Sequence, residues 1–143
     1  MAKVSEHFND KDFACNCKYC KGSLKISLGL IGALELIRCH FNRRVHIIRA
    51  YRCPELNNEI RGWNKSYHLE GKAADIVVSG VPYEEVFKFI EKNVPEIKGL
   101  GLYPGEKFVH LDVRDSEKIQ LWVYEMGKYC DLTPEKRAQY HLD

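Results

Sequence analysis

The sequence predicts a small α+β domain with a mainly antiparallel sheet and helices packed on one side of it. Residues 27–42 repeat apolar side chains at helical spacing, which indicates an amphipathic helix. Residues 73–79 and 108–114 alternate between two faces, which indicates strands. A length of 143 residues suits one domain with its own core. We expect a single domain with a cysteine-rich arm (1–25), a motif-bearing core (26–115) and a C-terminal extension (116–143).

Local start and stop signals support each expected element. Ser27 suits the cap of the first helix, and Pro82 suits the first position of a helix that Pro95 ends. A Pro-Gly pair at 104–105 is turn chemistry between two strands. Thr133 suits the cap of a last helix. In chain order we expect a helix at 27–42, a strand at 45–50, a helical turn at 55–61, a strand at 73–79, a helix at 82–95, strands at 99–103, 108–114 and 121–124, and a helix that begins at 133–135.

The charge balance argues against a dedicated nucleic-acid surface. Lys and Arg number 22 and Asp and Glu number 20, so the formal net charge is only +2. No segment reaches the roughly 20 apolar residues of a membrane span, and the first residues do not resemble a signal peptide. We therefore expect a soluble protein made in the cytoplasm, without a nucleic-acid partner. No pattern indicates an oligomeric state.

Three side chains on neighbouring predicted elements have the chemistry of zinc ligands. His68 and Asp75 lie in a Ser-x-His-x-x-Gly-x-Ala-x-Asp pattern, and His110 shares the polar face of strand 108–114 with Asp112. A lone histidine on a strand is more often a hydrogen-bonded surface residue, but the second cluster favours a metal. Two imidazoles and one carboxylate leave a zinc position open for water, which is typical of a catalytic site. The sequence predicts a hydrolase with one catalytic zinc on the open face of the sheet.

With these motifs, residues 13–114 resemble the zinc D-Ala-D-Ala carboxypeptidase family. The wider fold group also contains lysostaphin-type endopeptidases and the hedgehog signalling domain. The matching features are a Cys-rich start, a long helix, YRCPELN at 51–57, the pattern at 66–75, GLGLY at 99–103 and FVHLDVR at 108–114. The resemblance implies that His68, Asp75 and His110 bind zinc and that the substrates are peptidoglycan stem peptides and their cross-links.

The resemblance also implies a role for Arg52. In the carboxypeptidases an arginine of the Tyr-Arg segment grips the terminal carboxylate of the substrate, which a guanidinium binds bidentately. A structural ion pair is the alternative. Ser66 is expected to support the bound peptide or to orient His68. The aromatic residues near these motifs are expected to line the cleft or to pack beside it, and they are Trp63, Tyr67 and Tyr103.

The proton-transfer residue is the least determined part of the predicted site. Some relatives carry an acid three positions before the last histidine ligand, where this chain has Lys107. Asp112 is the preferred general base because it shares a strand face with His110, and its alternative role is to orient a ligand imidazole. Glu106 and Glu70 are weaker candidates.

The arm carries a second group of metal-ligand chemistry. Cys15, Cys17 and Cys20 form a Cys-x-Cys-x-x-Cys pattern, which needs a fourth ligand to make a structural zinc site. Reduced thiols are the preferred interpretation, and a disulfide would suit an extracellular destination. The candidates for a fourth ligand are Cys39, Cys53, Cys130 and His7.

Three functions fit these residues. The preferred one is a zinc metallopeptidase that cuts D-amino-acid-containing peptidoglycan peptides, either as a D-Ala-D-Ala carboxypeptidase or as an endopeptidase. An inactive zinc-containing binding module of the same fold is the alternative. The third is an interaction protein whose cysteine arm holds the only metal. Unless a signal peptide has been removed, we expect the protein to reach the cell wall only by release, as a phage endolysin would, or by another export route.

Overall fold

The computed structural model describes residues 2–62 and 65–143, and its centre is a six-stranded sheet in the order β1-β2-β4-β3-β5-β6. Neighbouring strands are antiparallel except β3 and β5, which are parallel. The elements are α1 (Asp10–Phe13), α2 (Leu28–Phe41), β1 (Val45–Arg49), α3 (Pro54–Glu59), the 3₁₀ helix η1 (Tyr67–Glu70), β2 (Ala73–Val78), α4 (Tyr83–Asn93), β3 (Gly99–Tyr103), β4 (Phe108–Asp112), β5 (Gln120–Glu125), β6 (Lys128–Asp131) and α5 (Pro134–Gln139).

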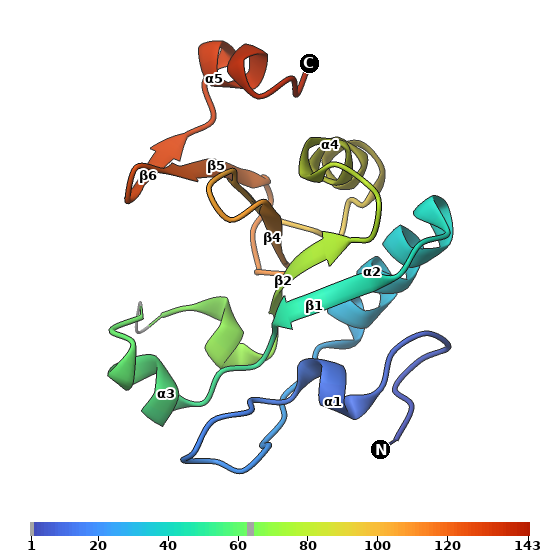
Figure 1. Cartoon of the computed structure of the whole chain (residues 1–143), viewed down its shortest axis with the longest axis vertical. Helices are drawn as coiled ribbons and strands as arrows, with labels where there is room; N and C mark the ends of the chain where they lie inside the picture. Colours follow the sequence, from blue (N-terminus) through green and yellow to red (C-terminus); the bar gives the residue numbers. More distant parts are fainter. Residues whose placement is uncertain (1, 63–64) are drawn as a thin grey trace.

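The two long helices pack on the same side of the sheet, as predicted (Figure 1). α2 contacts β1 and β2, and α4 contacts β2, β3 and β4. Fully buried Leu34 and Phe87 from these helices join Ile76, Leu100 and Leu111 of the strands in one core. Burying each such side chain contributes about 1.5–3 kcal/mol, so this face holds the sheet and helices together. The predicted α+β class is confirmed. None of the helices among the described residues is long and apolar enough to cross a membrane.

Several element boundaries differ from the prediction for local reasons. The arm is not wholly irregular, because Asn9 caps the single helical turn α1. Pro82 precedes α4 rather than starting it. The strand expected at 108–114 ends at Asp112, whose side chain accepts the backbone N–H of Arg114 at 3.2 Å. β6 was not predicted, and it pairs with β5 through a turn at Met126 and Gly127, both of which have positive φ angles.

One row of residues crosses the open face of the sheet. The strand register pairs Arg49 with Asp75, Asp75 with His110, His110 with Gly101, and Gly101 with Trp122. These residues belong to β1, β2, β4, β3 and β5 in that spatial order. Directly paired residues on one face of a sheet have neighbouring side chains, so this register alone sets Asp75 beside His110.

The glycines of β3 make room for this row. A Cβ atom on Gly101 would lie 2.4 Å from the Trp122 ring, and one on Gly99 would lie 2.2 Å from a carboxylate oxygen of Asp112. Real Cβ contacts are longer than this, so both neighbouring side chains need a glycine beneath them. The alternation in GLGLY therefore marks the site face, and Leu100 and Leu102 between the glycines are buried in the core.

We predict that Gly99→Ala destabilises the protein by about 1–3 kcal/mol, because the new methyl group overlaps the fully buried Asp112 carboxylate. Denaturant unfolding measures the change. Gly105→Ala is the matched control, since no atom lies within 4 Å of the added Cβ. Equal stability of the two variants would contradict the steric role of Gly99.

Candidate active site

Three buried side chains bring their metal-binding atoms together on the open face of the sheet. His68 lies in η1, Asp75 in β2 and His110 in β4, and their ligand atoms lie within 4.8 Å of one another. Asp75 Oδ1 is 2.9 Å from His110 Nδ1 and 3.4 Å from His68 Nε2. The structure thus brings together the three residues that the sequence predicted as zinc ligands.

Backbone contacts orient His68. Its Nδ1 donates a hydrogen bond to the carbonyl oxygen of Ala50 at 2.7 Å, so Nε2 carries the lone pair and faces Asp75. Gly71 ends η1 with φ at +71°, and a Cβ there would lie 2.5 Å from the backbone of Lys25. The glycine of the motif is therefore needed for both its conformation and its close packing.

His110 lies between two carboxylates. Nδ1 faces Asp75 Oδ1, and Nε2 donates to Asp112 Oδ2 at 2.7 Å. Burial alone would lower the pKa of His110, but the hydrogen bonds to Asp112 and Asp75 outweigh burial and raise this pKa to about 9. Burial would raise the pKa of Asp75, whereas His110 and His68 hold it well below its ordinary value. The network therefore favours an ionised Asp75.

Asp112 is fully buried and has its carboxylate oxygens occupied. Besides His110, it accepts hydrogen bonds from Arg114 Nε and Nη2, both at 2.8 Å, and from the Arg114 backbone N–H. Burial raises the pKa of this carboxyl, but Arg114 and His110 lower it to about 2. A carboxylate in these contacts orients His110, and this geometry supports the alternative to a general base.

The sequence analysis missed two residues that border the site. Arg49 Nε donates to Asp75 Oδ2 at 2.9 Å, so the second oxygen of the ligand carboxylate is already engaged. The Trp122 ring lies 5.2 Å from the His110 ring, above Gly101. For Trp122 the sequence carried a signal, because the alternating glycines of β3 leave room for a large side chain on this face. For Arg49 it did not, because the β1 register that places Arg49 depends on an irregularity between Ile47 and Arg49.

Arg52 and Ser66 lie beside the three ligands and contact each other. Arg52 Nη2 donates to Ser66 Oγ at 3.0 Å, and Ser66 Oγ also accepts the backbone N–H of His68. The Arg52 backbone N–H donates to the carbonyl oxygen of His68. Among the described residues, the buried Arg52 Nε has no hydrogen-bond partner. Burial lowers the pKa of Arg52, and Asp75 partly offsets this effect.

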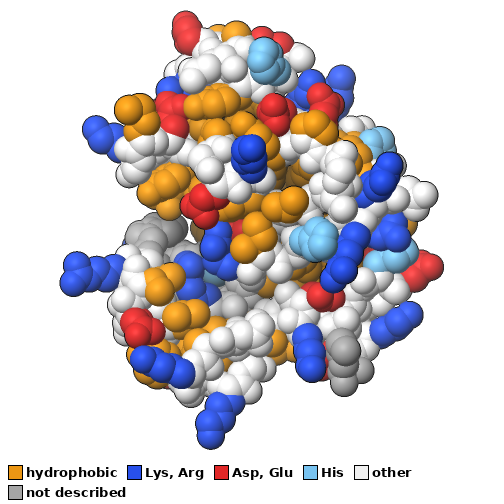
Figure 2. Space-filling view, in the orientation of Figure 1, with side chains coloured by type: hydrophobic (Ala, Val, Ile, Leu, Met, Phe, Trp, Pro, Cys, Tyr) orange, Lys and Arg blue, Asp and Glu red, His pale blue; other side chains and the backbone are white. Residues whose placement is uncertain are grey.

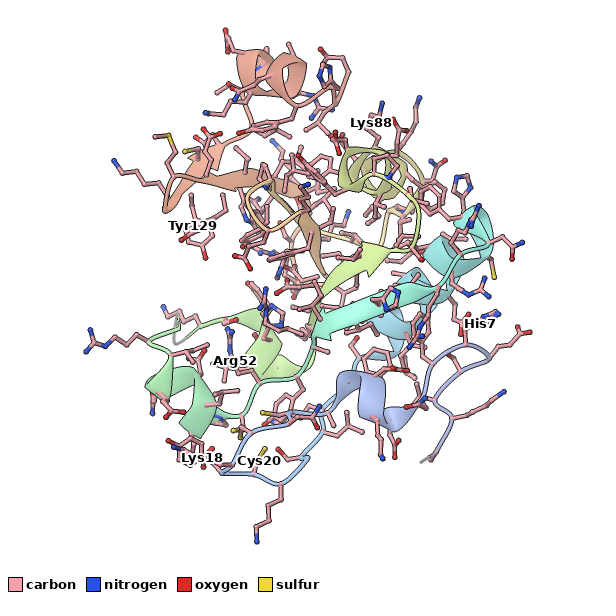
Figure 3. The ribbon with its side chains drawn as sticks, viewed as in Figure 1. His7, Lys18, Cys20, Arg52, Lys88 and Tyr129 are labelled. Carbon is pink, nitrogen blue, oxygen red and sulfur yellow. The ribbon has the colours of Figure 1, made fainter. Side chains whose placement is uncertain are left out.

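A hollow gives solvent access to this part of the site. A cavity of about 420 Å³ is lined by Arg49, Arg52 and His68 on one side and by arm residues, including Asp12 and Asn16, on the other. Figure 2 shows basic side chains inside a hollow on the left side of the view. In Figure 3, Arg52 points from the segment before α3 toward the sheet. An anionic substrate group can therefore reach a guanidinium beside the ligands.

The other acidic candidates are exposed and ion-paired. The Glu106 side chain is 64% exposed and lies 3.8 Å from Arg49, while Glu70 is 49% exposed and lies 3.6 Å from Lys72. Lys107 is in the turn between β3 and β4 with φ at 58°. These ion pairs do not bring the carboxylate of Glu106 or Glu70 to the three predicted zinc ligands.

The expected cleft aromatics have different positions. Tyr67 packs against the guanidinium of Arg114 at 4.5 Å. The hydroxyl of Tyr103 accepts a hydrogen bond from Trp122 Nε1 at 3.4 Å, and its ring stacks on Phe108. Trp63 lies outside the described residues.

The donor set fits a zinc ion. Zinc accepts imidazole nitrogen and carboxylate oxygen at roughly 2.0–2.2 Å, so neighbouring donors on a tetrahedron lie roughly 3.3 Å apart. The separations of 2.9 and 3.4 Å from Asp75 Oδ1 match that spacing. The second nitrogen of each imidazole is held by a carbonyl or carboxylate oxygen, as is usual for metal-bound histidines.

Comparison with known proteins identifies the family of this chain. Residues 6–112 match the family described as Peptidase M15. The chain belongs to the peptidase M15 family. Within it, the chain is similar to the peptidoglycan L,D-endopeptidase MepK of Escherichia coli K12, with 34% identity over 120 residues, and to the probable peptidoglycan L,D-endopeptidase MepK of Haemophilus influenzae, with 36% identity over 76 residues.

Each match covers only part of this chain and part of the relative. The E. coli match covers 78% of this chain and 60% of the relative, and the H. influenzae match covers 50% and 40%. The chain thus spans 60% or less of the length of these relatives. The predicted resemblance to zinc D-Ala-D-Ala peptidases is confirmed at the level of the family.

Proposed function

We propose that this chain is a zinc-dependent peptidase that hydrolyses peptide bonds in peptidoglycan. The observation that carries the proposal is the buried group of His68, Asp75 and His110 with oriented donor atoms beside a solvent-accessible hollow. The name of the similar MepK proteins favours an L,D-endopeptidase. The guanidinium of Arg52, held by Ser66 and lining the hollow beside His68, favours a substrate that presents a carboxylate, as a D-Ala-D-Ala carboxypeptidase substrate does.

Each side chain has a separate task in this proposal. His68 Nε2, Asp75 Oδ1 and His110 Nδ1 hold the metal, while Ala50 and Asp112 keep the imidazoles in the required orientation. A zinc ion held there would supply Lewis-acid chemistry, that is, polarisation of the scissile carbonyl and a lower pKa, toward about 7, for its bound water. Arg52 binds a carboxylate of the peptide, and Ser66 holds the Arg52 guanidinium beside His68.

We further propose that Asp112 positions His110 and does not take the proton of the attacking water. Its buried carboxylate already accepts hydrogen bonds from His110 and Arg114, so a water molecule has no open approach to it. The sequence analysis preferred Asp112 as the general base. We propose instead its alternative role, which is to orient a ligand imidazole.

An inactive zinc-containing binding module is the second candidate. Lys107 occupies the position where some relatives carry an acid, and Asp112 is engaged by other residues. A protein with the ligands but without a proton acceptor would bind zinc and peptide without turnover.

Digestion of purified peptidoglycan tests the proposed function. We expect new stem-peptide fragments by mass spectrometry, their loss with a chelator, and a fall to the uncatalysed background in His68→Ala. His46→Ala is the matched control, because His46 is an exposed histidine of β1 outside the site. Fragments cut at an L,D bond identify an endopeptidase, and release of terminal D-alanine identifies a carboxypeptidase. Zinc binding without any fragment would instead identify the inactive module.

For Asp112→Asn we expect zinc affinity to fall about 10–100-fold, because an amide cannot hold both Arg114 and the His110 N–H as a carboxylate does. Competition with a chelator measures the affinity, and thermal unfolding checks that the variant folds. Unchanged zinc affinity combined with lost turnover would make Asp112 the general base.

For Arg52→Lys we expect kcat/KM to fall roughly 10–100-fold on peptides with a free terminal carboxylate, since a charge-assisted hydrogen bond contributes about 1.5–3 kcal/mol. The same peptides with an amidated end serve as the comparison and should lose much less. Equal losses on both substrates would show that Arg52 is structural.

A further inference from the structure

Four cysteine side chains converge beneath the segment that carries Arg52. Cys15, Cys17 and Cys20 come from the arm, and Cys53 is the N-cap residue of α3. All four sulfur atoms lie within 4.8 Å of one another, and Cys17 Sγ is 3.4 Å from the sulfurs of both Cys20 and Cys53. Figure 3 shows sulfur atoms gathered near Cys20, between the arm and the segment before α3.

Backbone contacts build this cluster into the fold. The Tyr51 N–H donates to the Phe13 carbonyl at 3.0 Å, and Phe13 is almost fully buried in the main core. The Cys15 N–H donates to Ser23, which closes the arm into a loop around the thiols. The Leu56 N–H donates to Cys53 Sγ at 3.5 Å. The arm and α3 thus present their sulfurs to a common centre without belonging to the same element.

We propose that Cys15, Cys17, Cys20 and Cys53 bind a structural zinc ion, separate from the site on the sheet. Zinc–sulfur bonds of about 2.3 Å place the sulfurs of a tetrahedral four-cysteine site roughly 3.8 Å apart. The observed separations of 3.4 Å, and the limit of 4.8 Å for the rest, bracket this value. Four ligands leave no position for water, as a structural site requires.

The remaining cysteines do not share this arrangement. Cys39 lies exposed near His7 and Glu35, and Cys130 is half-buried in β6. His7 Nδ1 contacts Glu35 Oε1 at 2.6 Å, so this histidine is engaged away from the thiols. Of the four candidates named from the sequence, Cys53 is the one that completes the set.

The position of the cluster assigns it a role that rests on the proposed function. Cys53 follows Arg52 directly, and the arm contacts this segment through the Phe13–Tyr51 hydrogen bond and through the packing of its cysteines against Tyr51 and Cys53. A metal that joins the arm to Cys53 restrains the backbone of Arg52 and hence its guanidinium beside Ser66. The structural zinc is therefore expected to position the carboxylate-binding arginine.

Cobalt substitution of the full chain tests the metal site independently of activity. We expect thiolate-to-cobalt charge-transfer absorption in the wild-type protein and in His68→Ala, because the latter retains all four thiols. Cys17→Ser should lose most of this absorption, whereas Cys130→Ser, a matched half-buried cysteine, should keep it. Absence of the absorption from reduced wild-type protein would overturn the proposal, even if peptidoglycan hydrolysis is observed.

Alkylation of the wild-type chain provides a test that needs no folded variant. Cys17, Cys20 and Cys130 are all half-buried, so their intrinsic access is comparable. With zinc bound, Cys130 should react while Cys17 and Cys20 are protected, and a chelator should remove that protection. Equal reaction of the three thiols with zinc present, or isolation of Cys17 in a disulfide, would contradict the site.

The link to Arg52 has its own readout. In Cys17→Ser, the ratio of kcat/KM for free-carboxylate over amidated peptides should fall in the same direction as in Arg52→Lys. An unchanged ratio in a variant that has lost the thiolate–cobalt absorption would overturn the positioning role and leave the metal site intact. If the wild-type protein shows the thiolate–cobalt absorption but does not hydrolyse peptidoglycan, the proposed function is contradicted and the metal site is not.

Discussion

The site depends on the antiparallel pairing of β2 with β4, which sets Asp75 directly opposite His110. Side chains alternate between the two faces of a strand, so a slip of one residue in this pairing would move one of the two into the helix-covered core. The apolar residues that follow them along each strand prevent such a slip, because Ile76 and Leu111 fill that core. Packing on one face of the sheet thereby determines the chemistry on the other.

Charge pairing is the second constraint on this face. Asp75 and Asp112 are buried carboxylates, and each is matched by a cationic partner, Arg49 and Arg114 respectively. An unpaired charge at such depth would be strongly destabilising, so the arginines are needed for the fold as well as for the site. His110 lies between the two carboxylates and is held from both sides. In our proposal, Asp112 therefore orients His110 and does not transfer the proton.

The proposed substrate-binding side is built differently from the proposed metal site. Arg52 lies between β1 and α3, outside the sheet ladder, and its guanidinium is held by Ser66. Nearby contacts come from the arm, whose thiols surround Cys53. In our proposals one metal ion activates the reaction, while a second joins the arm to the segment that recognises the peptide. The four cysteines would then stabilise the segment between β1 and α3, which the sheet does not hold.

The sequence alone determined the helices α2 and α4, most strands, and the choice of His68, Asp75 and His110 as candidate zinc ligands that lie together. Periodicity and motif spacing are local properties, so they could be recognised without the fold. The alternation in β4 also placed His110 and Asp112 on one face correctly. Only the tertiary structure decided what Asp112 contacts, that Arg49 meets Asp75, and that Cys53 joins the three arm cysteines. Those contacts join residues on different elements or depend on side-chain direction, and local sequence patterns carry neither the strand register nor the packing that sets them.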